Sequence, residues 1–464
     1  MKPSHYPLDE PIAAIATALA PAALGVIRTS GTGSIELVSK IFSRPDRLVR
    51  AEGNTVVHGW LVNGEEKIDE VLASVFRAPK SFTGEDSVEL SVHGGPAAVL
   101  SVFRLLLSAG FREAERGEFT FRAFAHGKTD LARAEAVREI IGAHTDTARA
   151  HAVNRLAGGL SGEVAAITAR IVRSLAAIEV EIEYPEDEET TAGAFDSQGI
   201  QEARDRLARL ESSWASEKLL QEGVMIVLAG RTNAGKSSLF NTLLKEERSI
   251  VSDIHGTTRD WIESNADFLG IPVRMYDTAG LRETGDEIEA EGVQRSRRLL
   301  SRCDLVLYVV DGTEGIQEQD RTFLAESAQN APPVILVWNK ADSEKKAALP
   351  DAQELPGVRA IHETSAKTGE GISCLVSSAV SIVTGGLQTT SRHDISLGTE
   401  RQKNAVHDAL HALDHALGAA TAGYPVDALC QDLEDALSFL GQITGEVTSS
   451  DILDAVFSGF CVGK

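Results

Sequence analysis

The stretch GRTNAGKS at residues 230–237 decides the fold of the central part of this chain, because it is a complete G-x4-G-K-S phosphate loop. The loop directly follows the apolar run MIVLAG and directly precedes SSLFNTLLK, which has a helical pattern. In this arrangement backbone N–H groups converge on the phosphates of a nucleotide, Lys236 reaches the β- and γ-phosphates, and the Ser237 hydroxyl binds Mg²⁺. The other residues predicted to contact the nucleotide here are Asn233, Ala234, Gly235 and Ser238.

Further motifs predict that the nucleotide is GTP. DTAG follows the apolar run VRMY, so we expect Asp277 to hold the magnesium shell and the Gly280 N–H to sense the γ-phosphate. NKAD ends another apolar run, and the Asp342 carboxylate can accept hydrogen bonds from guanine N1–H and the N2 amine, whereas adenine presents a repulsive pattern. A later SAK sequence fits the loop that closes over the base. The predicted contacts are Asp277, Thr278, Ala279, Gly280, Asn339, Lys340, Asp342, Ser365, Ala366 and Lys367, and we expect Lys236 and Asp277 to act in catalysis.

The sequence GTTRD at residues 256–260 lies where the first switch of a GTPase should be, and it would supply a threonine to Mg²⁺. The residue after DTAG is Leu281, whereas Ras-like enzymes have a glutamine there that orients the attacking water. Leucine cannot do this. Either hydrolysis is crippled or another group holds the water.

Apolar runs alternate with helical patterns from residue 224 to about residue 380, which predicts a doubly wound, mostly parallel sheet. The first 110 residues are mixed α/β, with strand-like runs and an amphipathic helix in PAAVLSVFRLLLSAG that Gly110 closes. Ala-rich helical sequence lies on both sides of the α/β unit, at about 117–222 and 397–440, so we expect these two stretches to pack together. The predicted fold class is multidomain, α/β plus all-α.

Composition excludes several classes of protein. The chain has 464 residues and a formal net charge of −23, so it carries no global basic field for nucleic acid; residues 1–150, with 17 basic and 19 acidic side chains, would repel RNA least. No apolar run reaches the roughly 20 residues that a membrane span needs, and no basic leader precedes the first acidic residues. Four widely spaced cysteines exclude a disulfide scaffold and a CxxC zinc site. We therefore expect a cytoplasmic protein without a membrane partner.

Three histidines, His407, His411 and His415, recur every four residues on one helix face. They could form a metal-binding face, but their apolar neighbours supply a core stripe. We favour a solvated polar face.

The whole chain resembles the MnmE (TrmE) family of tRNA-modification GTPases. The resemblance lies in GTTRD, in DTAGLRETGDEIE, in the asparagine of TNAGKS and in the terminal FCVGK. It extends to SFTGEDSVELSVHGG (residues 81–95), GEFTFRAFAHGKTDLARAEAV (residues 117–137) and ITGEVTSSDILDAVFSGFCVGK (residues 443–464). These motifs outside the phosphate loop are far more specific than the loop itself.

The resemblance implies an N-terminal α+β domain at 1–118 that binds folate and dimerises, and a discontinuous helical domain at 119–221 and 383–464. It implies a potassium-activated GTPase at 222–382, inserted in the helical domain. Such proteins are homodimers that act with the flavoprotein MnmG on C5 of the wobble uridine of certain tRNAs. The one-carbon unit comes from methylene-tetrahydrofolate, and glycine or ammonium gives the aminomethyl product.

Position by position, the resemblance implies the following site residues. Asn233 and the carbonyl groups of Ser252 and Ile254 would bind K⁺ near Thr257, and Ser237 and Thr258 would bind Mg²⁺. Glu289 matches the catalytic glutamate that polarises the water through a bridging water, which would replace the missing glutamine. The implied folate contacts, for 5,10-methylene- or 5-formyl-tetrahydrofolate, are Arg28, Glu89, Lys128 and Lys464, and Cys461 is a possible reactive thiol.

This sequence departs from the family pattern at Thr232 and Arg116, where proline is usual, and at His126, where asparagine is usual. The first two change loop stiffness, and the third adjoins a folate position. None removes a charged or metal-binding group.

A different class of function is a ribosome-assembly or RNA-binding GTPase switch that binds RNA without modifying it. Such proteins share GTTRD-type switches but usually add a basic module, which the negative charge of every segment here argues against. A helical scaffold with a decayed GTPase is excluded because every nucleotide motif is intact.

Overall fold

The computed structural model describes residues 6–183, 195–246, 263–277, 299–327, 332–345, 347–352, 355–386, 394–425 and 427–463. The chain divides into two compact units. The first unit comprises Met1–Arg138, Leu156–Asp205 and Asn404–Lys464. The second unit comprises Glu139–Arg155 and Arg206–Lys403. The domain boundaries at 118, 221 and 382 stay predictions.

The N-terminal part of the first unit is a six-stranded sheet in the order β3-β4-β5-β2-β1-β6. Its strands are β1 (Ile12–Ile15), β2 (Leu24–Ser30), β3 (Thr55–Asn63), β4 (Glu66–Phe76), β5 (Ser87–His93) and β6 (Arg112–Glu113). Neighbouring strands are antiparallel except β1 and β6, which are parallel. The strands expected here from alternating sequence are confirmed.

Short helices α1 (Ser34–Ser39) and α2 (Pro45–Val49) and the longer α3 (Pro96–Ala109) accompany this sheet. Val102 and Leu106 of α3 pack with sheet residues in one hydrophobic cluster that includes Leu90. Proline at the first position of α3 and Gly110, which has a φ of 116°, after its last residue set its two ends. This confirms the predicted helix.

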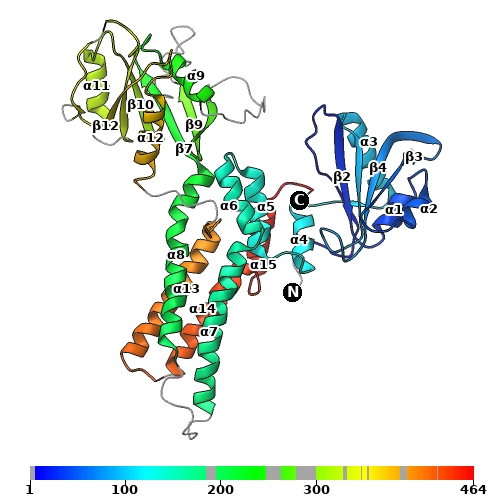
Figure 1. Cartoon of the computed structure of the whole chain (residues 1–464). Helices are drawn as coiled ribbons and strands as arrows, with labels where there is room; N and C mark the ends of the chain where they lie inside the picture. The colour runs from blue at the N-terminus through cyan, green and yellow to red at the C-terminus, as the bar shows by residue number, and fades with distance from the viewer. Residues whose placement is uncertain are drawn as a thin grey trace. The chain divides into compact units, whose positions relative to one another are not determined.

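The helices outside the two sheet-containing parts are divided between the two units: most of α6 and of α8 belongs to the second unit, and the others belong wholly or mainly to the first. The chain from Gly117 onward, predicted as helical sequence, divides into α4 (Glu118–Ala125), α5 (Leu131–Gly142), α6 (Asp146–Leu156), α7 (Gly159–Glu183) and α8 (Ser197–Glu222), and after the α/β domain come α13 (Glu400–Thr421), α14 (Asp427–Thr444) and α15 (Ser450–Ser458). Helices α7 and α14 pack together (Figure 1), and Arg204 of α8 forms an ion pair with Asp414 of α13 at 2.8 Å between Nε and Oδ1. The predicted packing of the two helical stretches is confirmed.

The three histidines of α13 are exposed while Leu410 and Leu413 are buried, which confirms the polar face. His415 contacts Asp432 of α14 at 2.7 Å. Within the described ranges, no group of three metal-ligating side chains gathers, and no helix is both long and apolar enough to cross a membrane.

The second unit contains a six-stranded sheet in the order β12-β11-β10-β7-β9-β8. Its strands are β7 (Val224–Gly230), β8 (Glu263–Phe268), β9 (Ile271–Asp277), β10 (Leu305–Asp311), β11 (Val334–Asn339) and β12 (Val358–Glu363). All pairs are parallel except β8 with β9, so the predicted mostly parallel sheet is confirmed. The edge strands β8 and β12 were not predicted, because ESNADF and VRAIHE lack a continuous apolar run.

Helices cover both faces of this sheet (Figure 1). Helices α9 (Lys236–Glu246) and α12 (Ile372–Val383) contribute Leu239 and Leu375 to the cluster on one face. Helix α11 (Glu318–Ser327) contributes Leu324 to the cluster on the other face. This is the doubly wound arrangement that the sequence predicted.

Helix α6 packs on this domain within the second unit. Its Ala148 belongs to the core cluster that holds the β7 and β9 side chains, and Gly270, in the turn between β8 and β9, lies so close to Thr147 that an added Cβ would overlap that side chain. The helix therefore contacts the turn between the two strands that follow the first switch in sequence.

A buried ionic network joins α6 to the segments that enter and leave the α/β domain. Arg155 donates from NH2 to Glu217 Oε1 at 2.7 Å, from Nε to Glu139 Oε2 at 2.7 Å and from NH1 to Ser396 Oγ at 2.8 Å. The other oxygen of Glu217 accepts from His151 Nδ1 at 2.8 Å and from Ser396 Oγ at 2.9 Å. Both Glu217 oxygens are thus satisfied, as a buried carboxylate requires.

Candidate functional site

The phosphate loop connects β7 to α9, as predicted. Its backbone is left-handed at Asn233, with a φ of 66°, and at Gly230 and Gly235. A side chain at Gly235 would overlap the Asn339 amide nitrogen, so glycine is required there by both conformation and space. Lys236 is almost fully buried, and its Nζ donates to the carbonyl oxygens of Gly230 at 2.9 Å and Arg231 at 2.7 Å. The ammonium group is thereby held across the loop.

Two of the groups predicted to hold Mg²⁺ meet at the start of α9. The Ser237 hydroxyl donates to Asp277 Oδ2 at 2.9 Å, and Asp277, the last residue of β9, is only 7% exposed. Mg²⁺ prefers hard oxygen ligands and is usually bound by one or two protein groups together with substrate phosphates and water. A hydroxyl and a carboxylate that already lie within hydrogen-bonding distance fit this requirement.

Asn339 connects the phosphate loop to the predicted base-binding loop. It is buried at the end of β11, where its Nδ2 donates to Ala234 O at 2.9 Å and its Oδ1 accepts from Ala366 N at 3.1 Å. One side chain therefore fixes the spacing between the loop at 230–237 and the loop at 365–367.

The carboxylate predicted to recognise guanine is held from one side. Ser365 Oγ donates to Asp342 Oδ1 at 2.8 Å, and Lys367 Nζ lies 3.8 Å from Oδ2. The Ser365 hydrogen bond, helped by the charge of Lys367, lowers the pKa of Asp342 below its ordinary value. The group is therefore an ionised acceptor at neutral pH, as recognition of two guanine donors requires.

Two positioning residues were not predicted. Asp311, at the end of β10, accepts from Lys340 Nζ and from Thr313; these bonds outweigh burial and lower the pKa of Asp311. This holds Lys340, whose backbone is left-handed. Thr242 Oγ1 donates to Ala366 O at 2.7 Å and so ties α9 to the base loop. Asp311 could have been found from the sequence, because it precedes a glycine at the end of an apolar run. No sequence pattern indicated the role of Thr242.

Several predicted site residues lie outside the described residues. They are Ser252, Ile254, Thr257 and Thr258 of the first switch, Thr278, Ala279 and Gly280 of DTAG, the predicted catalytic Glu289, and the terminal Lys464.

A second candidate site lies in the first unit, around Arg28. Its Nε donates to Glu89 Oε1 at 2.7 Å, from the directly opposite position on the neighbouring strand. The guanidinium carbon lies 5.0 Å from the ring centroid of Phe82 and 5.2 Å from that of Phe119, and NH1 donates to Gly463 O at 3.3 Å. Residues from both ends of the chain therefore meet, as the resemblance required.

The loop at residues 79–85 connects Lys128 to this site. Lys128 Nζ donates to Pro79 O at 2.8 Å, and His126 Nδ1 lies 2.8 Å from Thr83 O, so this nitrogen must be the protonated donor. Histidine thus replaces the usual asparagine with a hydrogen bond to the loop that carries Phe82. The Arg28 guanidinium near two aromatic rings, the Glu89 carboxylate, and the Lys128 ammonium bonded to the 79–85 loop fit the chemistry of a folate, which has a flat pterin with donor groups and glutamate carboxylates.

A buried arginine supports the same loop and was not predicted. Arg122 is fully buried; its NH1 donates to both oxygens of Glu85, at 3.1 and 3.2 Å, and its NH2 donates to Glu118 at 2.9 Å. Ser30 Oγ also donates to Glu85 at 2.7 Å. The C-terminal tail, residues 459–463, reaches this region through an antiparallel β-bridge between Arg116 and Val462. Cys461, the residue before Val462, is exposed.

Comparison with known proteins supplies the context for both sites. The family model for the MnmE helical domain matches residues 131–461, and the model for the GTP-binding protein TrmE N-terminus matches residues 11–128. The chain is 50% identical over 476 residues to the tRNA modification GTPase MnmE of Treponema denticola, with both chains covered completely. It is 41% identical to the protein of that name from Carboxydothermus hydrogenoformans, covering 98% of this chain and all of the relative.

Among solved structures, the G domain of the Thermotoga maritima FeoB iron transporter is 30% identical and covers 34% of this chain and 98% of its own, with a TM-score of 0.27. Aquifex aeolicus Era bound to GDP·AlF4⁻ is 25% identical and covers 41% of this chain and 66% of its own, also with a TM-score of 0.27. At these scores the full-length sequence relatives, and not the structures, carry the family assignment.

Proposed function

This chain belongs to the MnmE family of tRNA modification GTPases, and we propose that it hydrolyses GTP to drive modification of C5 of the wobble uridine, position 34, in certain tRNAs. It would act as a homodimer in the cytoplasm together with the flavoprotein MnmG. The product would be the aminomethyl or carboxymethylaminomethyl form, built with a one-carbon unit from a tetrahydrofolate derivative.

For GTP hydrolysis, we assign charge neutralisation on the β- and γ-phosphates to Lys236, whose ammonium is already held across the phosphate loop. Ser237 and Asp277, with Thr258, would hold Mg²⁺, which when bound neutralises phosphate charge. Asp342 would accept both guanine donors, and Asn339 would keep the base loop and the phosphate loop at a fixed spacing. These contacts fix the spacing of the two loops that would hold the phosphates and the base.

The missing glutamine after DTAG requires another way to orient water. We assign this to Glu289, twelve residues after Asp277. Asn233, with the carbonyl groups of Ser252 and Ile254 and with Thr257, would hold K⁺, which when bound supplies positive charge where the transition state gains negative charge.

For the modification chemistry, we assign the pterin and glutamate portions of the folate to Arg28, Glu89 and Lys128, with Lys464 completing the site from the tail and Cys461 as a thiol beside it. The single observation that carries the proposal beyond GTP hydrolysis is the hydrogen bond from Arg28 to Gly463 O. A GTPase that only switches between RNA-bound and free states has no evident need to bring its C-terminal tail to a charged pair in its N-terminal sheet.

The test is reconstitution. The full chain, purified MnmG, unmodified tRNA, GTP, KCl, methylene-tetrahydrofolate and glycine are incubated, and the nucleosides are analysed by mass spectrometry. We expect a modified wobble uridine that disappears when GTP or the folate is omitted or when Na⁺ replaces K⁺. GTP turnover at full rate with unmodified uridine would favour the binding-only switch instead.

A further inference from the structure

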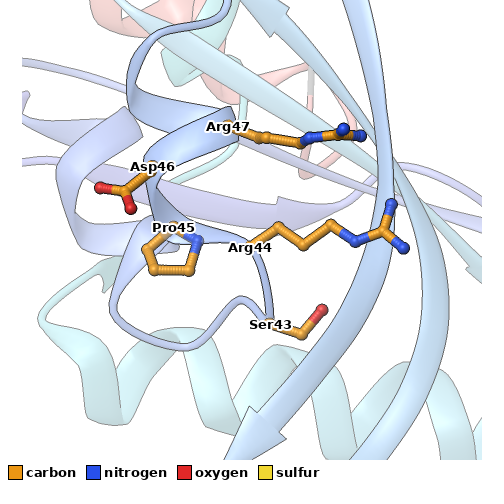
Figure 2. A pocket seen from close by; sticks show the side chains of 5 residues that line it. All are labelled: Ser43, Arg44, Pro45, Asp46 and Arg47. Atoms are coloured by element: carbon orange, nitrogen blue, oxygen red, sulfur yellow. The ribbon is translucent and has the colours of Figure 1, made fainter.

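The connection around α2 is basic on a chain that is otherwise strongly acidic. Residues 40–50, KIFSRPDRLVR, carry four basic side chains and one acidic side chain, whereas the whole chain has a net charge of −23. Arg44, Arg47 and Arg50 follow one another at intervals of three residues, and all three are exposed. Within this segment the molecule has an open hollow lined by Ser43, Arg44, Pro45, Asp46 and Arg47 (Figure 2).

The two arginines of the hollow are placed side by side. Figure 2 shows the Arg44 and Arg47 side chains extending in the same direction, with the Asp46 carboxylate pointing to the opposite side. Arg44 NH1 donates to the backbone oxygen of His58 at 3.2 Å, which fixes one guanidinium group beside β3. Ser43 exchanges backbone and side-chain hydrogen bonds with Trp60 of the same strand, at 2.8 and 2.9 Å. The hollow is therefore anchored to a rigid strand.

These guanidinium groups lack the carboxylate partners that several other arginines of the first 150 residues have. In the part of the chain that the structure describes, no carboxylate forms an ion pair with Arg44, Arg47 or Arg50. By contrast, ion pairs with carboxylates engage Arg28, Arg112, Arg122, Arg133 and Arg149. The nearby Glu70 is engaged by His58 at 2.8 Å. An uncompensated pair of cations is thus presented beside β3, the last strand of the sheet, where a bridge between Phe42 and Leu61 attaches the segment.

The chemistry of the hollow favours phosphodiesters. Adjacent guanidinium forks match phosphate oxygens in a bidentate manner, and phosphates repeat along a nucleic-acid backbone as the arginines repeat along this segment. The hollow has no apolar anchor apart from Pro45, whereas protein–protein interfaces are centred on buried aromatic or apolar side chains. Lys67 of the neighbouring strand β4 adds a further positive charge beside β3, with its Nζ 4.7 Å from the ring centroid of Trp60.

We propose that the Arg44–Arg47 hollow, extended by Arg50, binds the phosphodiester backbone of the tRNA substrate. This inference rests on the proposed function, because it places a part of the substrate that the GTP and folate sites leave unassigned. It also answers the electrostatic difficulty of an acidic protein that acts on RNA, since a short unneutralised segment supplies the contacts that the net charge does not.

The test uses the full chain together with MnmG and a fluorescently labelled tRNA transcript. Binding is followed by anisotropy between 50 and 200 mM KCl for wild type, for Arg44→Glu/Arg47→Glu and for Arg44→Lys/Arg47→Lys. A matched control, Arg104→Glu/Arg173→Glu, changes the charge equally at two other exposed arginines. GTP turnover and the mass of the dimer in solution are measured for each protein.

We expect the glutamate variant to bind tRNA about tenfold or more weakly at 100 mM salt. The slope of log K against log salt should fall in magnitude by about 1.4 to 1.8, the value for two lost phosphate contacts. The lysine variant should keep most of this slope, the matched control should resemble wild type, and GTP turnover should not change.

Equal tRNA affinity and slope in wild type and the glutamate variant would overturn the proposal, as would dissociation of the dimer, which would make the hollow an interface between copies. A wild-type protein that modifies wobble uridine while the glutamate variant binds tRNA normally would refute only this inference. A wild-type protein that hydrolyses GTP but neither binds nor modifies tRNA would refute the proposed function as well.

Discussion

Replacing Glu217 with glutamine tests whether the buried network around Arg155 holds α6 to the segments that enter and leave the α/β domain. The substitution keeps the shape of the side chain and removes its charge. Arg155 would keep its ion pair with Glu139 but lose the one with Glu217, and His151 would lose its anionic acceptor. The change is thus confined to one buried charge.

The expected loss of stability in Glu217→Gln follows from the pKa of Glu217. Burial alone would raise that pKa, but hydrogen bonds from His151 and Arg155 and the charge of Arg155 outweigh burial and lower it from 4.5 to about 2. A shift of this size corresponds to about 3 kcal/mol of folding free energy. Breaking a buried ion pair by removing one partner costs about 3–5 kcal/mol, and the remaining Glu139 partner favours the lower end. We therefore expect Glu217→Gln to destabilise the network by about 3 kcal/mol at pH 7.

Hydrogen exchange measured by mass spectrometry reports this locally. A loss of about 3 kcal/mol should speed amide exchange in α6 and the C-terminal half of α8 about a hundredfold. Glu202→Gln is the control, because Glu202 forms an ion pair with Arg170 at the surface of the protein. Such surface ion pairs contribute less than about 1 kcal/mol to stability. Unchanged exchange in α6 would refute the assigned role of the network.

The pH dependence of stability is a second test of this network. The quantity measured is the difference in unfolding free energy between wild type and Glu217→Gln as the pH is lowered. Because the folded-state pKa of Glu217 is lowered, its contribution is fully present above about pH 4.5 and is lost as the pH falls toward 2. The difference between the two proteins should therefore shrink over that range. A difference that stays constant into acid would show that the lost stability is not electrostatic.

Three further predictions concern the sites. Asp342→Asn should weaken GTP binding at least about tenfold and shift preference toward xanthosine triphosphate, because an amide can pair with xanthine where the carboxylate paired with guanine; unchanged GTP affinity in a nucleotide titration would remove Asp342 from the site. GTP turnover should be much faster in KCl than in NaCl at matched ionic strength, with K⁺ favouring pairing of the GTPase domains when a transition-state analogue is bound, and equal rates would contradict the cation role of Asn233. Deleting residues 462–464 should abolish wobble-uridine modification and leave GTP hydrolysis largely intact, since the tail contacts Arg28 and not the phosphate loop; a truncated protein that binds 5-formyl-tetrahydrofolate with native affinity would refute the tail assignment.

The nucleotide site was predictable because each of its motifs is local in sequence. Lys236 and Asp342 lie in short loops, and their residue types are those that binding of phosphates and of guanine would require. The hydrogen bonds that link these loops could not be predicted from the sequence. Asn339 was predicted as a nucleotide contact, but its bonds to Ala234 and Ala366 join positions far apart in sequence. The same holds for Arg155, whose partners lie 16, 62 and 241 residues away, with no periodic pattern to signal them.

The N-terminal site was predictable only by resemblance. Nothing in the spacing of Arg28 and Glu89 indicates that antiparallel strands place them opposite each other. The edge strands β8 and β12 escaped prediction for a related reason, because a strand that is partly exposed does not need an uninterrupted apolar sequence.

Mass spectrometry of nucleosides in tRNA from a strain that lacks the protein tests most directly whether this GTPase modifies the wobble uridine. We expect the modified wobble uridine to be missing in that strain and to return when the wild-type chain is supplied. A chain that lacks residues 462–464 should not restore it. Fully modified wobble uridine in the strain without the protein would refute the proposed function.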